Sequence, residues 1–391
     1  MVTSGDIGPG LASTATEKAA PGTPVRRQPA PHMAVSSETK TLCIGFLGAD
    51  WWGSDARAMA AEFRRRGHLL AERHYEDWLP TKWSGTFLKA ARRLLRPVIA
   101  RAYNAAVLQL LSVQALDFLL VFKGMLLQPE ILAKFKQAGV PCYCFYPDVS
   151  FLDHGSNIFR SLRHYDCLIT TKSYHLADPL LRKEVRRMEF AGHGFDPEVH
   201  REVTISTKLA NSYGCDVSFV GAWSPKKDAC LAGLIEACPG LNLRIWGPAW
   251  NRASSRVRPA WQGRGAYGDE LAAIYGSSKV NLGLLSEAGG GVASGDATTA
   301  RTWQIPASRG FLLHEDTGEV RRYFEEGKEI ALFQNVPELV ARVNHYLRSA
   351  TEREAVRDAG WRRAHTGPYS YAPAVDRILE IHRELQDSFA K

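Results

Sequence analysis

The sequence predicts an α/β protein built from two doubly wound, Rossmann-like domains. Its 391 residues are more than one ordinary hydrophobic core requires, and they suit two domains. Short apolar runs alternate with amphipathic stretches, a pattern typical of parallel strands connected by helices that cover both faces of a sheet. The alternation restarts near residue 214. We therefore expect two successive α/β units that face each other across a cleft.

The first unit is expected to span residues 39–205. Residues 1–38 are rich in Gly, Pro, Ala, Ser and Thr without hydrophobic periodicity, and they are interpreted as a disordered tail. Apolar runs then predict strands within residues 41–48, 68–75, 117–124, 140–146, 166–172 and 187–194. Between them lie helical patterns, including a long one in which Pro97 is expected to kink or split the helix.

The second unit is expected to span residues 206–365. Its strands are predicted within residues 216–221, 242–247, 279–286 and 310–316, with helices between them. The spacing of apolar residues predicts helical structure over residues 337–366. Residues 366–391 are expected to form a C-terminal helix that packs back on the first domain and links the two.

Composition limits the kind of protein. Apolar residues make up 45% and charged residues 23%, as in soluble globular proteins. A net charge of +8 favours an anionic partner such as a nucleotide or phospholipid, whereas nucleic acid is not expected because the basic residues are dispersed along the chain. The seven cysteines show no zinc-binding spacing, so we expect a reducing compartment and no metal. Without a long apolar run or a signal-like start, a cytoplasmic location is expected.

Several motifs in the second half carry a family resemblance. They are DVSFVGAWSPKKDACLAGL, WGPAW, T-x-R-x-W-x-I-P-A-x-x-G-F-L-L and YFEEGKEIALFQNVPELVARVNHYL. In this order, over roughly residues 214–380, they resemble the CgeB-like (spore protein) glycosyltransferases, which look like a branch of the GT-B sugar-nucleotide transferases. The first half matches that group in architecture alone. The resemblance implies a GT-B fold with the nucleotide-diphosphate sugar in the C-terminal domain, the acceptor in the N-terminal domain, and no other cofactor.

Two Gly-containing strand ends are candidate donor contacts. Gly221 ends a predicted strand and leads into a helix whose N-terminal amides suit a phosphate, and by resemblance Lys227 occupies the place of a diphosphate-binding arginine. Lys227 could otherwise belong to a solvated lysine pair. Gly247 and Trp250 follow the next strand, where the indole would either stack on a nucleotide base or cover the core.

The segment from Asp296 to Gln304 is the second donor candidate. Thr299 and Arg301 start a predicted helix and present a polar edge to the cleft. Related retaining enzymes have two glutamates here, one near the donor sugar and one on the ribose, and the corresponding residues are Asp296 and Gln304. Asp296 is thus a catalytic candidate. Gln304 can exchange hydrogen bonds with a ribose hydroxyl but carries no charge.

Acceptor-side candidates follow a strand of the first unit. Asp148 and His154 come after VPCYCFY, where they could orient or deprotonate an acceptor hydroxyl. Asp148 could instead be a turn residue after Pro147, and His154 a surface histidine. Lys123, at another strand end, has the same ambiguity.

A basic amphipathic helix is predicted between residues 87 and 103. Leu94, Leu95 and Val98 lie on one face and Arg92, Arg93 and Arg96 on the other. This pattern suits peripheral contact with an anionic membrane, or a core helix with a solvated basic face.

The sequence thus predicts a metal-independent, hexosyltransferase-type enzyme that moves a sugar from a nucleotide-diphosphate sugar to a glycan, lipid-linked or protein hydroxyl. The alternative is a transferase-like binding protein without turnover, in cell-envelope or spore-coat assembly, which the absence of both family glutamates favours.

Overall fold

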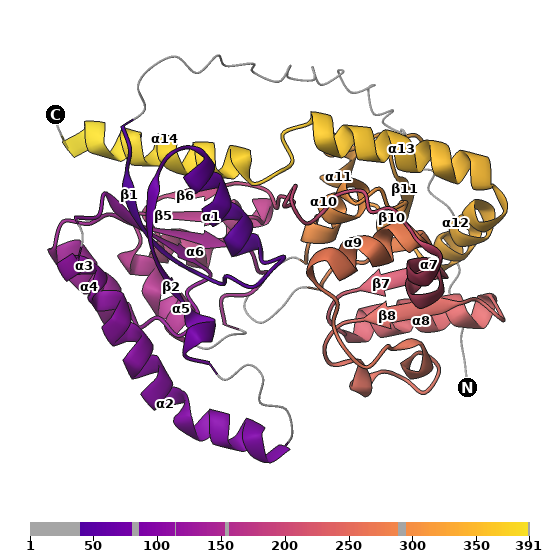
Figure 1. The fold of residues 1–391 in the computed structure, drawn as a ribbon, viewed down its shortest axis with the longest axis horizontal. Coiled ribbons are helices and arrows are strands. Elements are labelled where there is room, and N and C mark those ends of the chain that lie inside the picture. Colours follow the sequence, from indigo (N-terminus) through magenta and orange to yellow (C-terminus); the bar gives the residue numbers. More distant parts are fainter. Residues whose placement is uncertain (1–39, 80–85, 114, 153–155, 288–294, 390–391) are drawn as a thin grey trace, which may run out of the picture. The chain divides into compact units, whose positions relative to one another are not determined.

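The first half of the chain forms a six-stranded parallel sheet. In the computed structural model, which describes residues 40–79, 86–113, 115–152, 156–287 and 295–389, this sheet has the order β2-β1-β3-β4-β5-β6 (Figure 1). All its pairings are parallel. The strands are β1 (Cys43–Gly48), β2 (Leu69–His74), β3 (Phe118–Phe122), β4 (Cys142–Tyr146), β5 (Cys167–Thr170) and β6 (Met188–Phe190).

Both faces of this sheet are covered, which explains its continuous apolar runs. Along β3, Leu119 and Val121 belong to one core cluster and Phe118 and Leu120 to another, because successive side chains point to opposite faces. The helices of this half are α1 (Asp55–Arg65), α2 (Thr86–Leu108), α3 (Leu110–Val113), α4 (Pro129–Gln137), α5 (Ser156–Ser161) and α6 (Pro179–Glu184). The next helix, α7 (Thr207–Tyr213), packs on the second half. Residues of α2 and α4 share the first cluster, and residues of α1 share the second.

The second half forms a five-stranded parallel sheet in the order β11-β10-β9-β7-β8. Its strands are β7 (Cys215–Val220), β8 (Leu243–Trp246), β9 (Ser278–Gly283), β10 (Leu312–Glu315) and β11 (Ala331–Phe333). The associated helices are α8 (Pro225–Ala237), α9 (Gly268–Ser277), α10 (Ala300–Ala307), α11 (Val320–Tyr323), α12 (Val336–Arg348) and α13 (Ala350–Thr366). The sequence did not predict β11, since three residues are too few to show a period.

The last helix, α14 (Ala372–Phe389), contributes to the core of the first sheet. Its Val375, Ile378 and Ile381 are fully buried in the cluster that also holds Ile44 and Phe46 of β1. Figure 1 shows α14 lying across the elements of the first half, beside α1. Residues at the two ends of the described chain therefore build one core.

Pro97 neither ends nor divides its helix, contrary to one of the two outcomes expected from the sequence. It lies inside the single helix α2, which continues from Thr86 to Leu108. Within the described residues, none of the helices combines the length and the apolar character needed to cross a membrane.

Candidate functional site

A cavity of about 330 Å³ lies where the carboxyl ends of strands from both sheets come together. Ligands of open α/β sheets bind at such strand ends, and the volume suits a small ligand. Pro147, Asp148 and Val149 follow β4, Lys172 follows β5, and His193 follows β6. The second half contributes Ser286, Glu287, Asp296, Thr299, Ala300 and Arg301, from the segment after β9 and the start of α10.

A buried ion pair crosses this cavity. Lys172 Nζ lies 2.5 Å from Asp296 Oδ1, and the two side chains are only 3% and 5% exposed. Burial by itself would raise the pKa of Asp296, but the Lys172 ammonium outweighs this effect and the pKa is lowered. Asp296 is therefore a carboxylate at neutral pH, and its charge is balanced by a residue from the other sheet.

His193 completes this cluster as a neutral imidazole. Burial lowers the pKa of His193 to about 3, and the neighbouring Lys172 cation adds to the decrease. Lys172 Nζ lies 3.2 Å from His193 Nε2. Because an ammonium can only donate, Nε2 is the acceptor and the ring proton is on Nδ1. That buried Nδ1 has no hydrogen-bond partner among the described residues.

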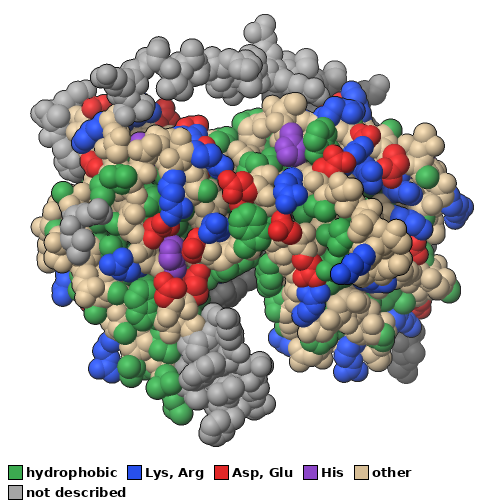
Figure 2. Space-filling model, in the orientation of Figure 1, with side chains coloured by type: hydrophobic (Ala, Val, Ile, Leu, Met, Phe, Trp, Pro, Cys, Tyr) green, Lys and Arg blue, Asp and Glu red, His purple; other side chains and the backbone are tan. Residues whose placement is uncertain are grey.

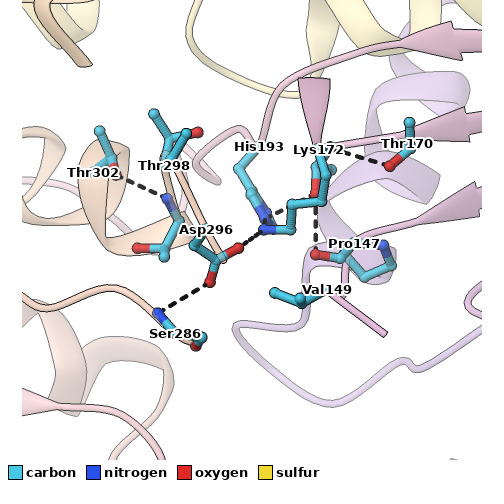
Figure 3. Close-up of polar contacts among 12 residues, drawn as sticks. Pro147, Val149, Thr170, Lys172, His193, Ser286, Asp296, Thr298 and Thr302 are labelled. Atoms are coloured by element: carbon cyan, nitrogen blue, oxygen red, sulfur yellow. Dashed lines mark hydrogen bonds and ion pairs between the residues drawn. The ribbon is translucent and has the colours of Figure 1, made fainter. Parts of the chain in front are cut away.

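The backbone around Asp296 fixes the direction of its carboxylate. Asp296 donates its N–H to the carbonyl of Ser286 at 3.0 Å, and Ser286 donates its N–H to Asp296 Oδ2 at 3.4 Å. Figure 3 shows Asp296 pointing from the second half toward Lys172 and His193. Thr302 Oγ1 accepts the N–H of Thr299 at 3.0 Å and so stabilises the start of α10. As predicted, α10 begins directly after Thr299.

Arg301 connects α10 to two strand ends. Its guanidinium donates to the carbonyl oxygens of Val220 at 3.2 Å and Leu284 at 2.6 Å, and it lies over the ring of Phe219. Its Nε has no partner among the described residues. The side chain is thus partly used in structural contacts while still lining the cavity with positive charge.

Lys227 lies one side chain away from the cavity. It is 4% exposed and donates to the carbonyl of Ala222 and to Ser286 Oγ, each at 3.3 Å. Burial lowers the pKa of Lys227 to about 8, and the nearby Arg301 cation contributes further. A buried lysine held near a second cation suits an anionic ligand that would relieve their repulsion.

The glycines at the ends of β7 and β8 are required by close packing. A Cβ at Gly247, where φ is +144°, would lie 1.9 Å from the carbonyl oxygen of Gly221. A Cβ at Gly221 would lie 2.8 Å from Nη1 of Arg301. The loop at Gly247 therefore approaches the Gly221 backbone more closely than any other residue type allows, whereas a Cβ at Gly221 would have to displace the Arg301 side chain.

Asp148 lines the cavity and is paired with Lys123, whose Nζ lies 2.5 Å from Asp148 Oδ2. Lys123 has a φ of +69°, a left-handed conformation that is uncommon for a lysine. The two ambiguous strand-end residues of the first half are thus brought together. The predicted catalytic residue His154 lies outside the described residues.

Trp250 and Gln304 do not line the cavity. Trp250 is fully buried in the core of the second half, and its indole donates to the carbonyl of Gly221 at 2.8 Å. The core interpretation is therefore the one that the structure shows, because a buried indole has no free face for a base. Gln304 is 8% exposed and lies one turn into α10, away from the cavity lining.

The cavity residues that were not selected from the sequence include Lys172, His193 and Ser286. Each follows a strand directly or within three residues, so the same strand-end rule that selected Asp148 applied to them. His193 was hidden because the strand was expected to reach residue 194, whereas β6 ends at Phe190. Over the described residues, no group of three or more His, Cys, Asp and Glu side chains is arranged to hold a metal ion.

Comparisons with known proteins agree with the resemblance seen in the sequence. Residues 227–380 match the model of a family described as glycosyl transferase-like. Comparison with curated protein sequences gives no match.

Solved structures with similar folds cover nearly the whole chain. The sucrose-phosphate synthase of Thermosynechococcus elongatus aligns with a TM-score of 0.63 and 12% identity, over 89% of this chain and 100% of that one. Anabaena HepE, solved with UDP and glucose, gives a TM-score of 0.56 and 12% identity, over 88% of this chain and 100% of that one. The trehalose 6-phosphate synthase of Burkholderia multivorans gives a TM-score of 0.54 and 12% identity, over 90% of this chain and 98% of that one.

At this identity these structures establish the fold alone, and the family match identifies the second half. The chain therefore has the GT-B fold, and its residues 227–380 match a glycosyl transferase-like family.

Proposed function

We propose that this protein transfers a sugar from a nucleotide-diphosphate sugar to a hydroxyl group of an acceptor. The observation that supports this most is the cavity itself. In it, an ionised carboxylate, Asp296, and a buried cation, Arg301, lie at the strand ends of a GT-B fold, and a second buried cation, Lys227, lies behind the lining residue Ser286. A donor sugar needs a carboxylate that accepts hydrogen bonds from its hydroxyls, and a diphosphate needs positive charge.

In the proposed complex, the diphosphate lies near Lys227 and the first amides of α8 and α10. These cations and helix ends stabilise the charge that develops on the leaving diphosphate, so we propose that the protein needs no metal for this step. Asp296 accepts hydrogen bonds from the donor sugar, as the family resemblance implies. The stereochemical course that we propose, also from that resemblance, is retention.

The acceptor side of the proposed complex is provided by the first half. Asp148, which lies 2.5 Å from Lys123 Nζ, orients the acceptor hydroxyl. The hydroxyl oxygen bonds to the anomeric carbon from the face that the diphosphate leaves, and its proton passes to the departing diphosphate oxygen. The bond between that carbon and the diphosphate oxygen breaks in the same reaction. The neutral His193 positions Lys172, which in turn holds Asp296.

Donor binding can be tested with a matched pair of lysine variants. Among UDP-, GDP- and TDP-sugars, the true donor at 100 times its dissociation constant should stabilise the protein by about 2.7 kcal/mol in a thermal-shift assay. We expect Lys227→Met to weaken nucleotide binding about tenfold or more, since it removes a charged contact. Lys226→Met removes an exposed neighbour that pairs with Glu315 and should bind like the wild type.

Turnover is tested by slow hydrolysis of the bound donor, which Asp296→Asn should abolish. Nucleotide binding without hydrolysis or transfer to any acceptor would instead favour the binding protein without turnover. If no nucleotide sugar shifts the unfolding temperature, the proposed donor site is wrong.

We also propose that α2 contacts an anionic membrane surface, as a transferase with a lipid-linked acceptor would require. Residues 94–98 of α2 are all exposed, including Leu94 at 82% and Val98 at 56%. The helix sequence contains five basic residues and no acidic one. Figure 1 shows the first half of α2 extending beyond the other elements of the first half. Exposed apolar side chains on a helix whose sequence is rich in basic residues fit the interface of an anionic bilayer.

The membrane contact predicts selective vesicle binding. In a flotation assay we expect the protein to bind vesicles of phosphatidylcholine and phosphatidylglycerol and to be released from them at high salt. It should not bind vesicles of pure phosphatidylcholine. Leu94→Ser/Val98→Ser should lower the partition coefficient about tenfold or more, because each buried methylene contributes about 0.8 kcal/mol. Leu69→Ser, at another exposed leucine, should have no effect. Equal binding by both variants would contradict the proposal.

A further inference from the structure

Three large aromatic side chains are exposed where the loop after β1 meets the loop before α9. Trp51, Trp52 and Tyr267 are 43%, 42% and 57% exposed. The rings of Trp51 and Tyr267 meet edge to face with centroids 5.0 Å apart. Proteins usually bury such residues, and an exposed aromatic cluster is a common feature of binding surfaces. Neither the family match nor the proposed donor site accounts for these residues.

Two glycines hold this aromatic cluster in place. Gly53 and Gly268 both have left-handed φ values, +90° and +59°. A Cβ at Gly53 would lie 2.7 Å from the amide nitrogen of Gly268, and a Cβ at Gly268 would lie 2.4 Å from Cδ1 of Trp52. The guanidinium of Arg57 lies over the Trp52 ring, 5.3 Å from its centroid. The aromatic rings are therefore arranged before any ligand binds, which lowers the entropy lost on binding.

The charges around the cluster are paired. Arg57 contacts Asp50 at 2.8 Å and Arg201 contacts Asp269 at 3.3 Å. Arg264 and Glu270 form a third pair. Figure 2 shows hydrophobic side chains at the centre of the visible face with both blue and red side chains around them. A site with apolar rings and balanced charges offers hydrogen bonds without attracting an anion or a cation.

The cluster is connected to the cavity from both sides. In the first half, Asp55 follows the aromatic loop, and burial raises the pKa of Asp55 to about 6 with a further contribution from the nearby cavity residue Asp148. In the second half, Gly247 donates its N–H to the carbonyl of Arg264 at 2.9 Å, and Gly247 packs against Gly221 beside Arg301. The aromatic cluster thus lies at the carboxyl ends of the same two sheets, beside other strand ends than those that line the cavity.

We propose that Trp51, Trp52 and Tyr267 bind a ring of an uncharged carbohydrate, so that the acceptor is a glycan or a glycoside. This inference rests on the proposed function. One face of a sugar ring presents C–H groups that pack on aromatic rings, and its hydroxyls can exchange hydrogen bonds with the paired carboxylates and guanidinium groups. A phosphorylated ligand would require excess positive charge at this place, and a stable protein partner would require a larger apolar area.

The proposal is tested by binding of neutral trisaccharides to the full chain in the presence of UDP. Maltotriose, cellotriose, chitotriose and mannotriose serve as probes, with saturation-transfer NMR and tryptophan fluorescence as readouts. We expect at least one to bind, and Trp51→Ala and Tyr267→Ala to weaken that binding about tenfold each. Trp51→Tyr should retain most of the affinity. Leu180→Ala, at an exposed leucine elsewhere, is the control and should bind like the wild type.

Nucleotide affinity separates the two proposals. UDP should bind all of these variants equally, so a selective loss of sugar binding supports the aromatic cluster as the acceptor site. The inference is overturned if none of the four sugars binds, if Trp51→Ala binds them like the wild type, or if Trp51→Ala loses UDP instead. Failure of UDP to bind the wild-type protein would contradict the proposed donor, whereas sugar binding would still be measured.

Discussion

Replacing Lys172 by methionine is expected to lower the free energy of unfolding by about 3–5 kcal/mol. The substitution preserves most of the side-chain volume but leaves the Asp296 carboxylate, 5% exposed, without its counterion. Removing one partner of a buried ion pair costs far more than the pair itself contributes, because an unpaired charge stays in a poorly solvated place. Urea denaturation at neutral pH measures the loss.

Adding Asp296→Asn to the Lys172→Met variant should recover most of the lost stability, since no unpaired charge then remains. The surface pair Lys123 and Asp148, with side chains 25% and 34% exposed, provides the matched comparison. Lys123→Met should cost about 1 kcal/mol or less. Equal losses at the two lysines would show that Asp296 is hydrated rather than buried.

The ion pair of Lys172 and Asp296 also determines how the free energy of unfolding depends on pH. In the wild type the pKa of Asp296 is lowered, so its contribution to stability is present above the carboxyl's unfolded-state pKa and is lost as the pH falls. Without Lys172, burial alone acts and raises that pKa. The Lys172→Met deficit should therefore shrink as the solution is made acidic and the carboxyl takes up a proton.

Trp250→Ala is also expected to be strongly destabilising, and it should lower the free energy of unfolding by about 3–5 kcal/mol. The indole is fully buried, meets Phe219 edge to face at 5.8 Å, and donates to the carbonyl of Gly221 at 2.8 Å. Truncation removes this packing and leaves a buried carbonyl without its donor. Trp250→Phe should lose less, because it keeps most of the apolar contact.

Nucleotide affinity distinguishes the two interpretations of Trp250. Measured at a temperature where Trp250→Phe is folded, the dissociation constant for UDP should equal that of the wild type if the indole belongs to the core. Weaker UDP binding at unchanged stability would restore the base-stacking role considered from the sequence.

The parallel sheets could be predicted because their strands are buried on both faces. Runs such as those of β3 and β4 are wholly apolar, and each is bounded by Gly, Pro or Asp. Shorter elements carried too little signal, as β11 shows with its three residues. Pro97 was expected to kink or split its helix, and α2 is not split there.

The candidate site was predictable only to the extent that strand ends reveal it. Asp148 and Asp296 both line the cavity, whereas their partners Lys123 and Lys172 lie far from them in sequence or on the other sheet. Whether an aromatic faces solvent depends on tertiary packing, which is why the buried Trp250 and the exposed Trp51 cannot be separated by local pattern. The Asp296 and Lys172 pairing is a contact between two sheets, and no spacing along the chain encodes it.

The position of α14 has a consequence for how the chain acquires its structure during synthesis. One face of the first sheet is completed by Val375, Ile378 and Ile381, which leave the ribosome some three hundred residues after β1. Until then Ile44 and Phe46 lack part of their cover, and such exposed apolar surface favours aggregation or chaperone binding. Contacts this distant in sequence also slow folding. The first domain to be synthesised should therefore be among the last to reach its final stability.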